Sequence, residues 1–380
     1  MRSLVALDMP AGTAFLQSMI SAWEAGDAVL PLDPRLPAPA RKALLERLRP
    51  GSIVDRAGDT TRLHDGIPVD SGDALVVATS GSTGDPKGVV LTHEAVRASA
   101  LATSTRLGVD THQDQWLACL PLAHVGGLSV LTRSIHTGTP IVIHDRFDPV
   151  RVEAAARAGA TLVSLVPTAL HRIHSDLFRS ILLGGTVPPE GLPPNVVTTY
   201  GMTETGSGVV YDGLPLDGVQ VKIGDGTTGS SGEVLLRGPM LLRCYRDGTD
   251  PRIGGGWLPT GDSGRLGSDG RLEVDGRMAE MIVTGGEKVW PAAVEAVLMR
   301  HRSVRDVAVS GRYDPEWGQR VVATIVPLDH DPPPRLDELV DIVRAELAPW
   351  AAPKQLDIVA SLPRTSSGKI RRQALGDLRG

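Results

Sequence analysis

Short apolar runs alternate with longer amphipathic stretches along the first half of the chain. Helical spacing of apolar positions predicts helices at residues 37–48 and 92–107. Asp148, Pro149 and residues 150–159 supply an N-cap, a first-turn proline and a glycine stop for another helix. Apolar runs bounded by turn residues predict buried strands at residues 74–79, 139–144, 161–166 and 179–185. Strands that alternate with helices indicate an α/β lobe with a parallel sheet.

The pattern changes after about residue 206. Short strand-like segments separated by Gly and Asp turns occupy residues 218–226, 231–238 and 264–276, which predicts a small antiparallel, barrel-like β lobe. Beyond Arg277 the strand-like segments mix with a helical pattern at residues 336–347, as in a compact α+β domain.

The length of 380 residues is too great for one hydrophobic core. We therefore expect an α/β protein of two domains. Residues 1–278 would form a large N-terminal domain of α/β lobes plus the small β-barrel-like lobe. Residues 279–380 would form a small, mobile α+β C-terminal domain joined by a short hinge.

Composition excludes several classes of protein. The net charge of -5 argues against a surface for nucleic acid or for an acidic membrane. Cys119 and Cys244 are far apart, so the sequence indicates neither a disulfide framework nor a zinc site. Asp8 and Pro10 interrupt the apolar N-terminus, and no run approaches the roughly 20 apolar residues of a membrane span. We expect a cytoplasmic protein with no nucleic-acid partner and no membrane span.

A Gly/Ser/Thr run follows the apolar residues 74–79 directly. Between a strand and a helix, such a run presents backbone N–H groups and hydroxyls to one point, an arrangement that binds phosphate. Lys87 would add a positive charge, and Lys is rare here, at 6 of the 39 basic residues. Two residues separate Gly84 from Lys87, so the spacing of a P-loop ATPase is not met. The alternative is a flexible, solvated turn.

The segment "TSGSTGDPKGV" at residues 79–89 resembles the phosphate-binding signature of the adenylate-forming enzymes, the acyl-CoA synthetase and luciferase superfamily. Other family motifs are matched in order by residues 200–206, 256–266, 276–295 and 362–372. The resemblance implies an enzyme that joins a carboxylate to AMP, releases pyrophosphate and passes the acyl group to a thiol. It also implies ATP and Mg²⁺ as cofactors and coenzyme A as the usual co-substrate. Such chemistry depends on positioning and charge neutralisation.

The resemblance assigns nucleotide-binding roles to matching positions. Thr203 would contact the α-phosphate, and Glu204 would help to hold Mg²⁺. Asp262 would accept hydrogen bonds from the ribose hydroxyls, and Arg277 would contact the ribose from the hinge side. The β- and γ-phosphates would be bound by Thr79, Ser80, Gly81, Ser82, Thr83, Gly84 and Lys87. The adenine and acyl group would be flanked by Gly184, Gly185, Thr186 and Tyr200.

Lys369, in "TSSGKI", resembles the family's C-terminal catalytic lysine, which bridges the reacting carboxylate and the α-phosphate. The C-terminal domain would close to deliver it. It would then swing so that residues 284–289 face the site, with Gly285, Gly286 and Lys288 on the coenzyme A side. At the hinge, where the family usually has Asp or Lys, this chain has Ala279 followed by Glu280, so its pivot departs from the pattern.

Residues 120–134 and 164–173 resemble the acyl-pocket region of compact bacterial o-succinylbenzoate:CoA ligases of menaquinone biosynthesis. Much of the family's usual N-terminal lobe is expected to be missing. Because o-succinylbenzoate is a dicarboxylate, its unreactive carboxylate needs a cation or several donors, for which Arg172, Thr168 and His124 are candidates.

Other readings stay open. Arg172 pointing to solvent from a helix is the alternative to its role in acid binding. Another aryl or fatty acid would keep the same ATP motifs, as would an adenylation enzyme that loads a carrier protein. A non-catalytic nucleotide binder would be expected to have lost Lys369, Glu204 or Asp262, and all three are present. The oligomeric state, including a homodimer, is also open.

Overall fold

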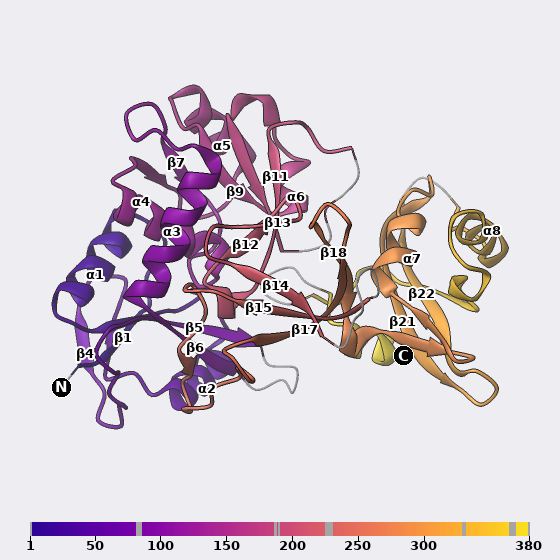
Figure 1. The fold of residues 1–380 in the computed structure, drawn as a ribbon, viewed down its shortest axis with the longest axis horizontal. Coiled ribbons are helices and arrows are strands. Elements are labelled where there is room, and N and C mark those ends of the chain that lie inside the picture. Colours follow the sequence, from indigo (N-terminus) through magenta and orange to yellow (C-terminus); the bar gives the residue numbers. More distant parts are fainter. Residues whose placement is uncertain are drawn as a thin grey trace. The chain divides into compact units, whose positions relative to one another are not determined.

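The computed structural model divides into two compact units (Figure 1). The first unit comprises residues 1–221 and 236–258, and the second comprises residues 222–235 and 259–380. The structure describes residues 2–80, 86–185, 188, 191–224, 231–328, 332–364 and 370–378.

A seven-stranded sheet in the first unit has the order β16-β6-β5-β2-β1-β3-β4. Its strands are β1 (Leu4–Leu7), β2 (Ala28–Pro31), β3 (Ser52–Val54), β4 (Thr60–Arg62), β5 (Asp73–Ser80), β6 (Pro86–Thr92) and β16 (Cys244–Tyr245). The strands β3, β1, β2 and β5 pair in parallel, with helices α1 (Thr13–Glu24) and α2 (Ala38–Leu48) in the connections. The hairpin β5–β6 is antiparallel.

The second sheet of this unit has the order β13-β12-β11-β10-β9-β7-β8. Its strands are β7 (Trp116–Ala118), β8 (Ile141–Ile143), β9 (Leu162–Leu165), β10 (Ser180–Leu183), β11 (Val196–Gly201), β12 (Gly208–Tyr211) and β13 (Leu214–Pro215). Neighbouring strands pair in parallel from β8 through β7, β9 and β10 to β11. β12 and β13 pair antiparallel at the other side of the sheet. This mixed α/β architecture confirms the predicted fold class.

The helices of this unit are α3 (His93–Leu107), α4 (Val125–Thr137), α5 (Pro149–Arg157) and α6 (Pro167–Leu170), with 3-10 turns η1 (Ser175–Leu177) and η2 (Thr203–Thr205). α3 and α4 lie side by side (Figure 1). The Thr92 side chain caps α3 by accepting from the N–H of Ala95, and Asp148 caps α5 through the N–H of Arg151. The helices predicted at residues 37–48, 92–107 and after Asp148 are therefore confirmed.

The second unit begins with a four-stranded sheet of order β14-β15-β17-β18. Its strands are β14 (Gln220–Ile223), β15 (Gly232–Arg237), β17 (Leu258–Leu266) and β18 (Leu272–Arg277). The chain passes from one unit to the other within β14 and β15. The predicted β lobe is thus confirmed. The division into compact units falls between residues 258 and 259. The predicted domain boundary after residue 278 is a different division and stays a prediction.

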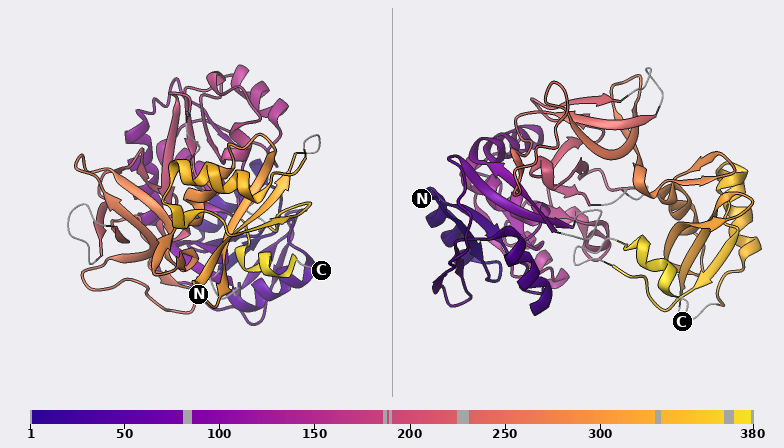
Figure 2. Two further views of the ribbon diagram at one scale, coloured as in Figure 1. Left: turned by 90° about the vertical axis from the view of Figure 1, so that its right-hand side faces the viewer. Right: turned by 90° about the horizontal axis from the view of Figure 1, so that it is seen from below.

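The rest of the second unit is the α+β part expected from the sequence (Figure 2). Its strands are β19 (Ile282–Thr284), β20 (Glu287–Val289), β21 (Val304–Asp314), β22 (Gly318–Pro327) and β23 (Gln355–Ile358). Its helices and turns are η3 (Met278–Glu280), α7 (Pro291–Leu298), α8 (Leu336–Glu346), η4 (Pro349–Ala351) and η5 (Arg372–Leu378). Val307 and Val309 pack with α7 and α8 in one core, whereas the alternating Ala308 packs with Leu375 on the other face.

Candidate active site

The predicted phosphate loop closes a β-hairpin between β5 and β6. Thr79 lies opposite Lys87 in this antiparallel pair, and Ser80 lies opposite Pro86. Gly81, Ser82, Thr83 and Gly84 lie outside the described residues. The hairpin base therefore places Thr79 and Lys87 opposite each other, and their role in phosphate binding stays a prediction.

The sequence prediction of a loop between a strand and a helix is wrong. A strand, β6, lies between the loop and α3. Val89, Val90 and Leu91 are buried and extend the sheet before Thr92 begins the helix. Their burial outweighs the turn-like composition of the preceding residues, so β6 and not α3 follows the loop along the chain.

Several other candidate residues follow the carboxyl ends of parallel strands. His124 comes after β7, Thr168 after β9, the Gly184-Gly185 pair after β10, and Tyr200 near the end of β11. The carboxyl ends of neighbouring parallel strands meet at one edge, where α/β proteins bind their ligands. The topology therefore gathers these residues at one edge of the second sheet of the first unit.

Two glycines at this edge are required by close contacts. A Cβ on Gly184 would lie 2.6 Å from Oγ1 of Thr199, and a Cβ on Gly201 would lie 2.3 Å from the carbonyl oxygen of Ser207. Gly185 has a φ of +99°, which disfavours any other residue. Thr186, also predicted here, lies outside the described residues.

Thr203 and Glu204 lie in the short turn η2, directly after β11. The Oγ1 of Thr205 accepts a hydrogen bond from the N–H of Met202 at 2.9 Å and donates to the carbonyl of Ser207 at 2.6 Å. Thr205 is fully buried. The turn is therefore held rigidly from within, while the side chains of Thr203 and Glu204 are only half-buried.

Tyr245 on β16 connects two of the predicted motifs. Its hydroxyl donates a hydrogen bond to Oε1 of Glu204 at 3.0 Å. The Nζ of Lys87 lies 4.9 Å from the centroid of the tyrosine ring. Burial and the neighbouring Glu204 carboxylate raise the pKa of the Tyr245 hydroxyl, so it stays protonated and donates. The sequence analysis missed Tyr245 because it is 41 positions from Glu204.

The candidates for acid binding are exposed or half-buried. Arg172 follows α6 rather than lying within a helix, and its guanidinium packs over the ring of Phe147 at 5.3 Å from the centroid. Thr168 is exposed, and His124, half-buried, precedes the first residue of α4. The assignment of Arg172 to the second carboxylate stays a prediction.

Arg133 is a buried cation that the sequence analysis did not identify. It is 3% exposed, and its guanidinium donates to Oγ of Ser164 and of Ser207, each at 3.2 Å. The ring of Trp116 lies 5.2 Å from it. Burial lowers the pKa of this guanidinium. Arg133 on α4 thus connects this helix to β9 and to the residue just after the "YGMTETG" motif.

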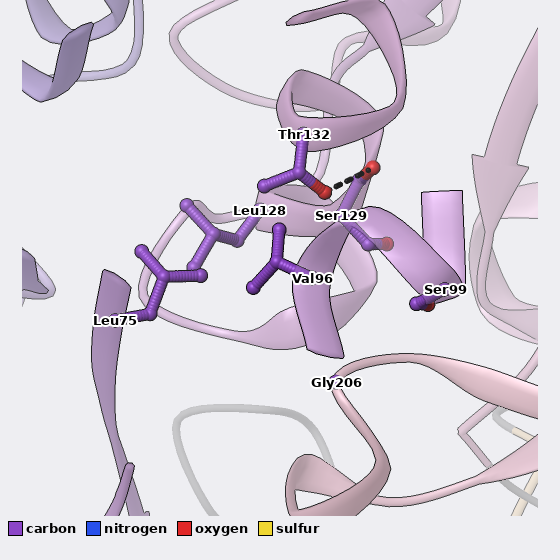
Figure 3. A pocket seen from close by; sticks show the side chains of 7 residues that line it. All are labelled: Leu75, Val96, Ser99, Leu128, Ser129, Thr132 and Gly206. Atoms are coloured by element: carbon purple, nitrogen blue, oxygen red, sulfur yellow. Dashed lines mark hydrogen bonds between the residues drawn. The ribbon is translucent and has the colours of Figure 1, made fainter. Parts of the chain in front are cut away.

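A small cavity lies beside this motif (Figure 3). Its volume is about 10 Å³, enough for at most one water molecule. The residues that line it are Leu75, Val96, Ser99, Leu128, Ser129, Thr132 and Gly206. The cavity is far too small for an aromatic acid, so it is not an acyl pocket.

In the second unit, the two predicted ribose ligands contact each other. Asp262 on β17 pairs in register with Arg277 on β18, and their side chains form an ion pair of 3.0 Å between Oδ1 and Nε. Arg277 also donates to the carbonyl of Thr260 at 2.8 Å. Asp262 is 6% exposed, whereas the Arg277 side chain is half-exposed. The pair fixes the carboxylate in one orientation.

The segment predicted to face coenzyme A is a tight hairpin. Gly285 and Gly286 form the turn between β19 and β20, with φ values of +59° and +86°, as a two-residue hairpin requires. The N–H of Gly285 donates to the carbonyl of Trp317 at 2.8 Å. Lys288 is exposed on β20.

Lys369 lies outside the described residues, but the chain three positions later is firmly anchored. Arg372 donates to both carboxylate oxygens of Glu295, at 2.5 and 3.0 Å, and to Glu280 at 2.8 Å. Glu295 also accepts from the N–H of Val309. The Arg372 side chain is 17% exposed. The anchor thus ties the C-terminal segment to Glu280, next to the predicted hinge position Ala279.

The comparisons with known proteins show the family of this chain. The chain matches the sequence profile of the AMP-binding enzymes over residues 58–246 and that of the AMP-binding enzyme C-terminal domain over residues 293–369. It is 40% identical over 338 residues to a probable 2-succinylbenzoate--CoA ligase of Mycobacterium tuberculosis, a match that covers 82% of this chain and 86% of that protein. The chain belongs to the adenylate-forming, or AMP-binding, enzyme family.

Solved structures of adenylate-forming enzymes have the same fold. The o-succinylbenzoate CoA synthetase (MenE) of Bacillus subtilis, in complex with the acyl-adenylate intermediate OSB-AMP, superimposes with a TM-score of 0.88 at 29% identity. That comparison covers 99% of this chain and 88% of the Bacillus protein. The same synthetase in complex with ATP and a magnesium ion gives a TM-score of 0.86 at 29% identity, over 98% and 89% of the two chains.

Proposed function

We propose that this adenylate-forming enzyme is an AMP-forming acid–thiol ligase that converts o-succinylbenzoate to its coenzyme A thioester in menaquinone biosynthesis. The observation that carries the proposal is the 40% identity to the Mycobacterium tuberculosis protein over most of both chains. The likeness in fold to the Bacillus subtilis synthetase that holds OSB-AMP supports the same substrate.

ATP, Mg²⁺ and coenzyme A are the proposed cofactors and co-substrate. The donor set fits a hard cation, because Glu204 offers a carboxylate, of which the Tyr245 hydroxyl contacts Oε1. When bound, the metal would neutralise phosphate charge. Lys87 and Thr79, at the base of the hairpin, would hold the β- and γ-phosphates, and Thr203 would orient the α-phosphate.

In the second unit, Asp262 would accept hydrogen bonds from the ribose hydroxyls, while Arg277 holds its carboxylate in place. Lys369 would donate to the reacting carboxylate and the α-phosphate, stabilising the charge that develops between them. Gly285 and Gly286 add no side chains of their own to the hairpin that would face the coenzyme A arm, and the ring of Trp317 packs against Gly285. These assignments, with Lys288, Gly184, Gly185 and Tyr200, are proposals from the family motifs.

We propose a cytoplasmic location. Cys119 and Cys244 are both free and buried, as suits a reducing compartment. Among the described residues, no helix has the length and apolar character needed to cross a membrane.

The first half-reaction tests the substrate. Purified enzyme with Mg²⁺ and ATP would be assayed for pyrophosphate exchange in the presence of o-succinylbenzoate, benzoate, medium-chain fatty acids or long-chain fatty acids. We expect o-succinylbenzoate to support the fastest exchange, since acids that lack the second carboxylate cannot make its contacts. Equal or faster exchange with a fatty acid would contradict the proposed substrate and leave the family assignment intact.

A further inference from the structure

Tyr245 contacts charged side chains from two separate motifs of the first unit. Its hydroxyl donates to Oε1 of Glu204 at 3.0 Å, and its ring lies 4.9 Å from the Nζ of Lys87. Lys87 belongs to the phosphate-loop hairpin, and Glu204 belongs to the η2 turn. A single side chain therefore touches the proposed phosphate cation and the proposed metal ligand.

The backbone around Tyr245 is tied to both motifs as well. Tyr245 pairs with Val89 of β6, two residues from Lys87. On the other side, the N–H of Leu242 donates to the carbonyl oxygen of Glu204 at 2.7 Å. The tyrosine is thus part of a short segment that is bonded to β6 and to the η2 turn, and its position is determined by both.

The charges explain why an aromatic residue with a hydroxyl suits this position. A direct ion pair between Lys87 and Glu204 would neutralise the two groups that the ATP and metal sites need. The structure shows no such pair between these two described residues: the tyrosine ring contacts the ammonium and its hydroxyl contacts the carboxylate. The Lys87 ammonium and the Glu204 carboxylate therefore each contact the tyrosine, and neither charge is neutralised.

We propose that Tyr245 is a positioning residue for MgATP. Its hydroxyl orients the Glu204 carboxylate toward the metal, and its ring holds the Lys87 ammonium apart from that carboxylate. The inference rests on the proposed function and on the metal role of Glu204. It predicts that Tyr245 acts on the affinity for the divalent cation and for the nucleotide, and that it takes no part in the bond-making steps.

The variant Tyr245→Phe tests the hydroxyl. The matched control is Tyr211→Phe. The buried Tyr211 hydroxyl also makes a side-chain hydrogen bond, but its partner is Oγ1 of Thr103, at 3.0 Å, and not Glu204. Mn²⁺ binding to the full chain with a non-hydrolysable ATP analogue would be measured by electron paramagnetic resonance. We expect Tyr245→Phe to weaken Mn²⁺ binding by about fivefold to tenfold, the scale of one ordinary lost hydrogen bond, and Tyr211→Phe to leave it unchanged.

A second readout is the Mg²⁺ dependence of pyrophosphate exchange. Excess Mg²⁺ should restore kcat in Tyr245→Phe, whereas a merely structural loss would not respond to the cation. Tyr245→Leu removes the ring too, and we expect it to bind the ATP analogue more weakly than Tyr245→Phe. Equal analogue binding by these two variants would show that the ring does not hold Lys87, and would overturn that half of the inference.

Glu204→Gln separates the ways in which the inference can fail. If it weakens Mn²⁺ binding and Tyr245→Phe does not, the positioning role of Tyr245 is wrong. If neither change affects Mn²⁺ binding, Glu204 is not a metal ligand and the inference falls with that assignment. The proposed ligase function is judged separately, by the product that the unaltered enzyme forms.

Discussion

The two compact units hold their candidate residues in different ways. In the first unit, the glycines and turns at the strand ends are fixed by close packing and by hydrogen bonds between hydroxyl and backbone groups. For example, a Cβ added to Gly201 would lie only 2.3 Å from a backbone oxygen. Thr205 is hydrogen-bonded within its own turn. In the second unit, ion pairs hold the segments that carry the candidate residues: Arg277 with Asp262, and Arg372 with Glu295 and Glu280.

This difference indicates how each unit should respond to substitution. Close packing tolerates no added atoms, so small increases in side-chain size should disturb the first unit most. Half-buried ion pairs respond instead to removal of one partner, because the remaining charge is left without compensation. The second unit should therefore be most sensitive to charge removal near the segments that carry its proposed catalytic and ribose-binding residues.

The largest effect is expected for Lys369→Ala in the second unit. Loss of the cation that stabilises the developing charge should reduce kcat for pyrophosphate exchange by on the order of 10²–10³-fold, with ATP binding nearly intact. Pyrophosphate exchange assays would measure kcat, and equilibrium binding would measure the affinity for ATP. Lys42→Ala is the control, because that side chain is exposed on α2. Exchange at the unaltered rate would remove Lys369 from the mechanism.

Arg372→Met breaks the anchor by charge removal while keeping an unbranched apolar stem. It leaves Glu295 buried without its cation, which should destabilise the second unit by about 3–5 kcal/mol. Hydrogen exchange of the β21 and β22 amides would report the local opening free energy. Arg300→Met, at an exposed ion pair with Glu346, should cost less than about 1 kcal/mol. Similar losses in both variants would show that the Arg372 anchor is no stronger than a surface pair.

Gly201→Ala tests the close packing of the first unit. The added methyl group meets the Ser207 carbonyl, so we expect a loss of about 1–3 kcal/mol in the free energy of unfolding and a raised KM for ATP. Urea unfolding and steady-state kinetics would measure these changes. Gly254→Ala, where nothing lies within 4 Å of the added atom, is the matched control. An alanine at position 201 without effect would mean that the η2 turn adapts freely.

Arg172→Ala should give the smallest effect. Because Arg172 is exposed, a pair with the substrate's second carboxylate should contribute at most about 1 kcal/mol, or roughly a fivefold rise in KM for o-succinylbenzoate with kcat unchanged. Arg157→Ala, an exposed arginine on α5, serves as the comparison. An unchanged KM would exclude Arg172 from acid binding.

Sequence patterns predicted the parts of the molecule that depend on local signals. The cap Asp148, the helix at residues 92–107 and the apolar run of β9 could be predicted because each depends on neighbouring residues. The strand β6 was missed, since its apolar residues follow a glycine-rich loop and precede a helix without a turn between them. The family motifs supplied the candidate site residues, whose roles stay proposals.

Long-range contacts could not be predicted from one sequence. Arg372 is 77 positions from Glu295, and Tyr245 is 41 positions from Glu204, so no periodicity relates them. Arg133 has the same difficulty, because an arginine within an apolar helix gives no sign of which hydroxyls it will reach. The chain brings such partners together only through the packing of its sheets and helices.

The measurement that tests the central claim most directly is mass-spectrometric detection of the thioester. Purified enzyme with ATP, Mg²⁺ and coenzyme A would be offered o-succinylbenzoate, benzoate, medium-chain and long-chain fatty acids in parallel. The account predicts o-succinylbenzoyl-CoA as the dominant product. Preferential formation of another acyl-CoA would contradict the proposed substrate, and an acyl-adenylate without any thioester would contradict coenzyme A as the acceptor.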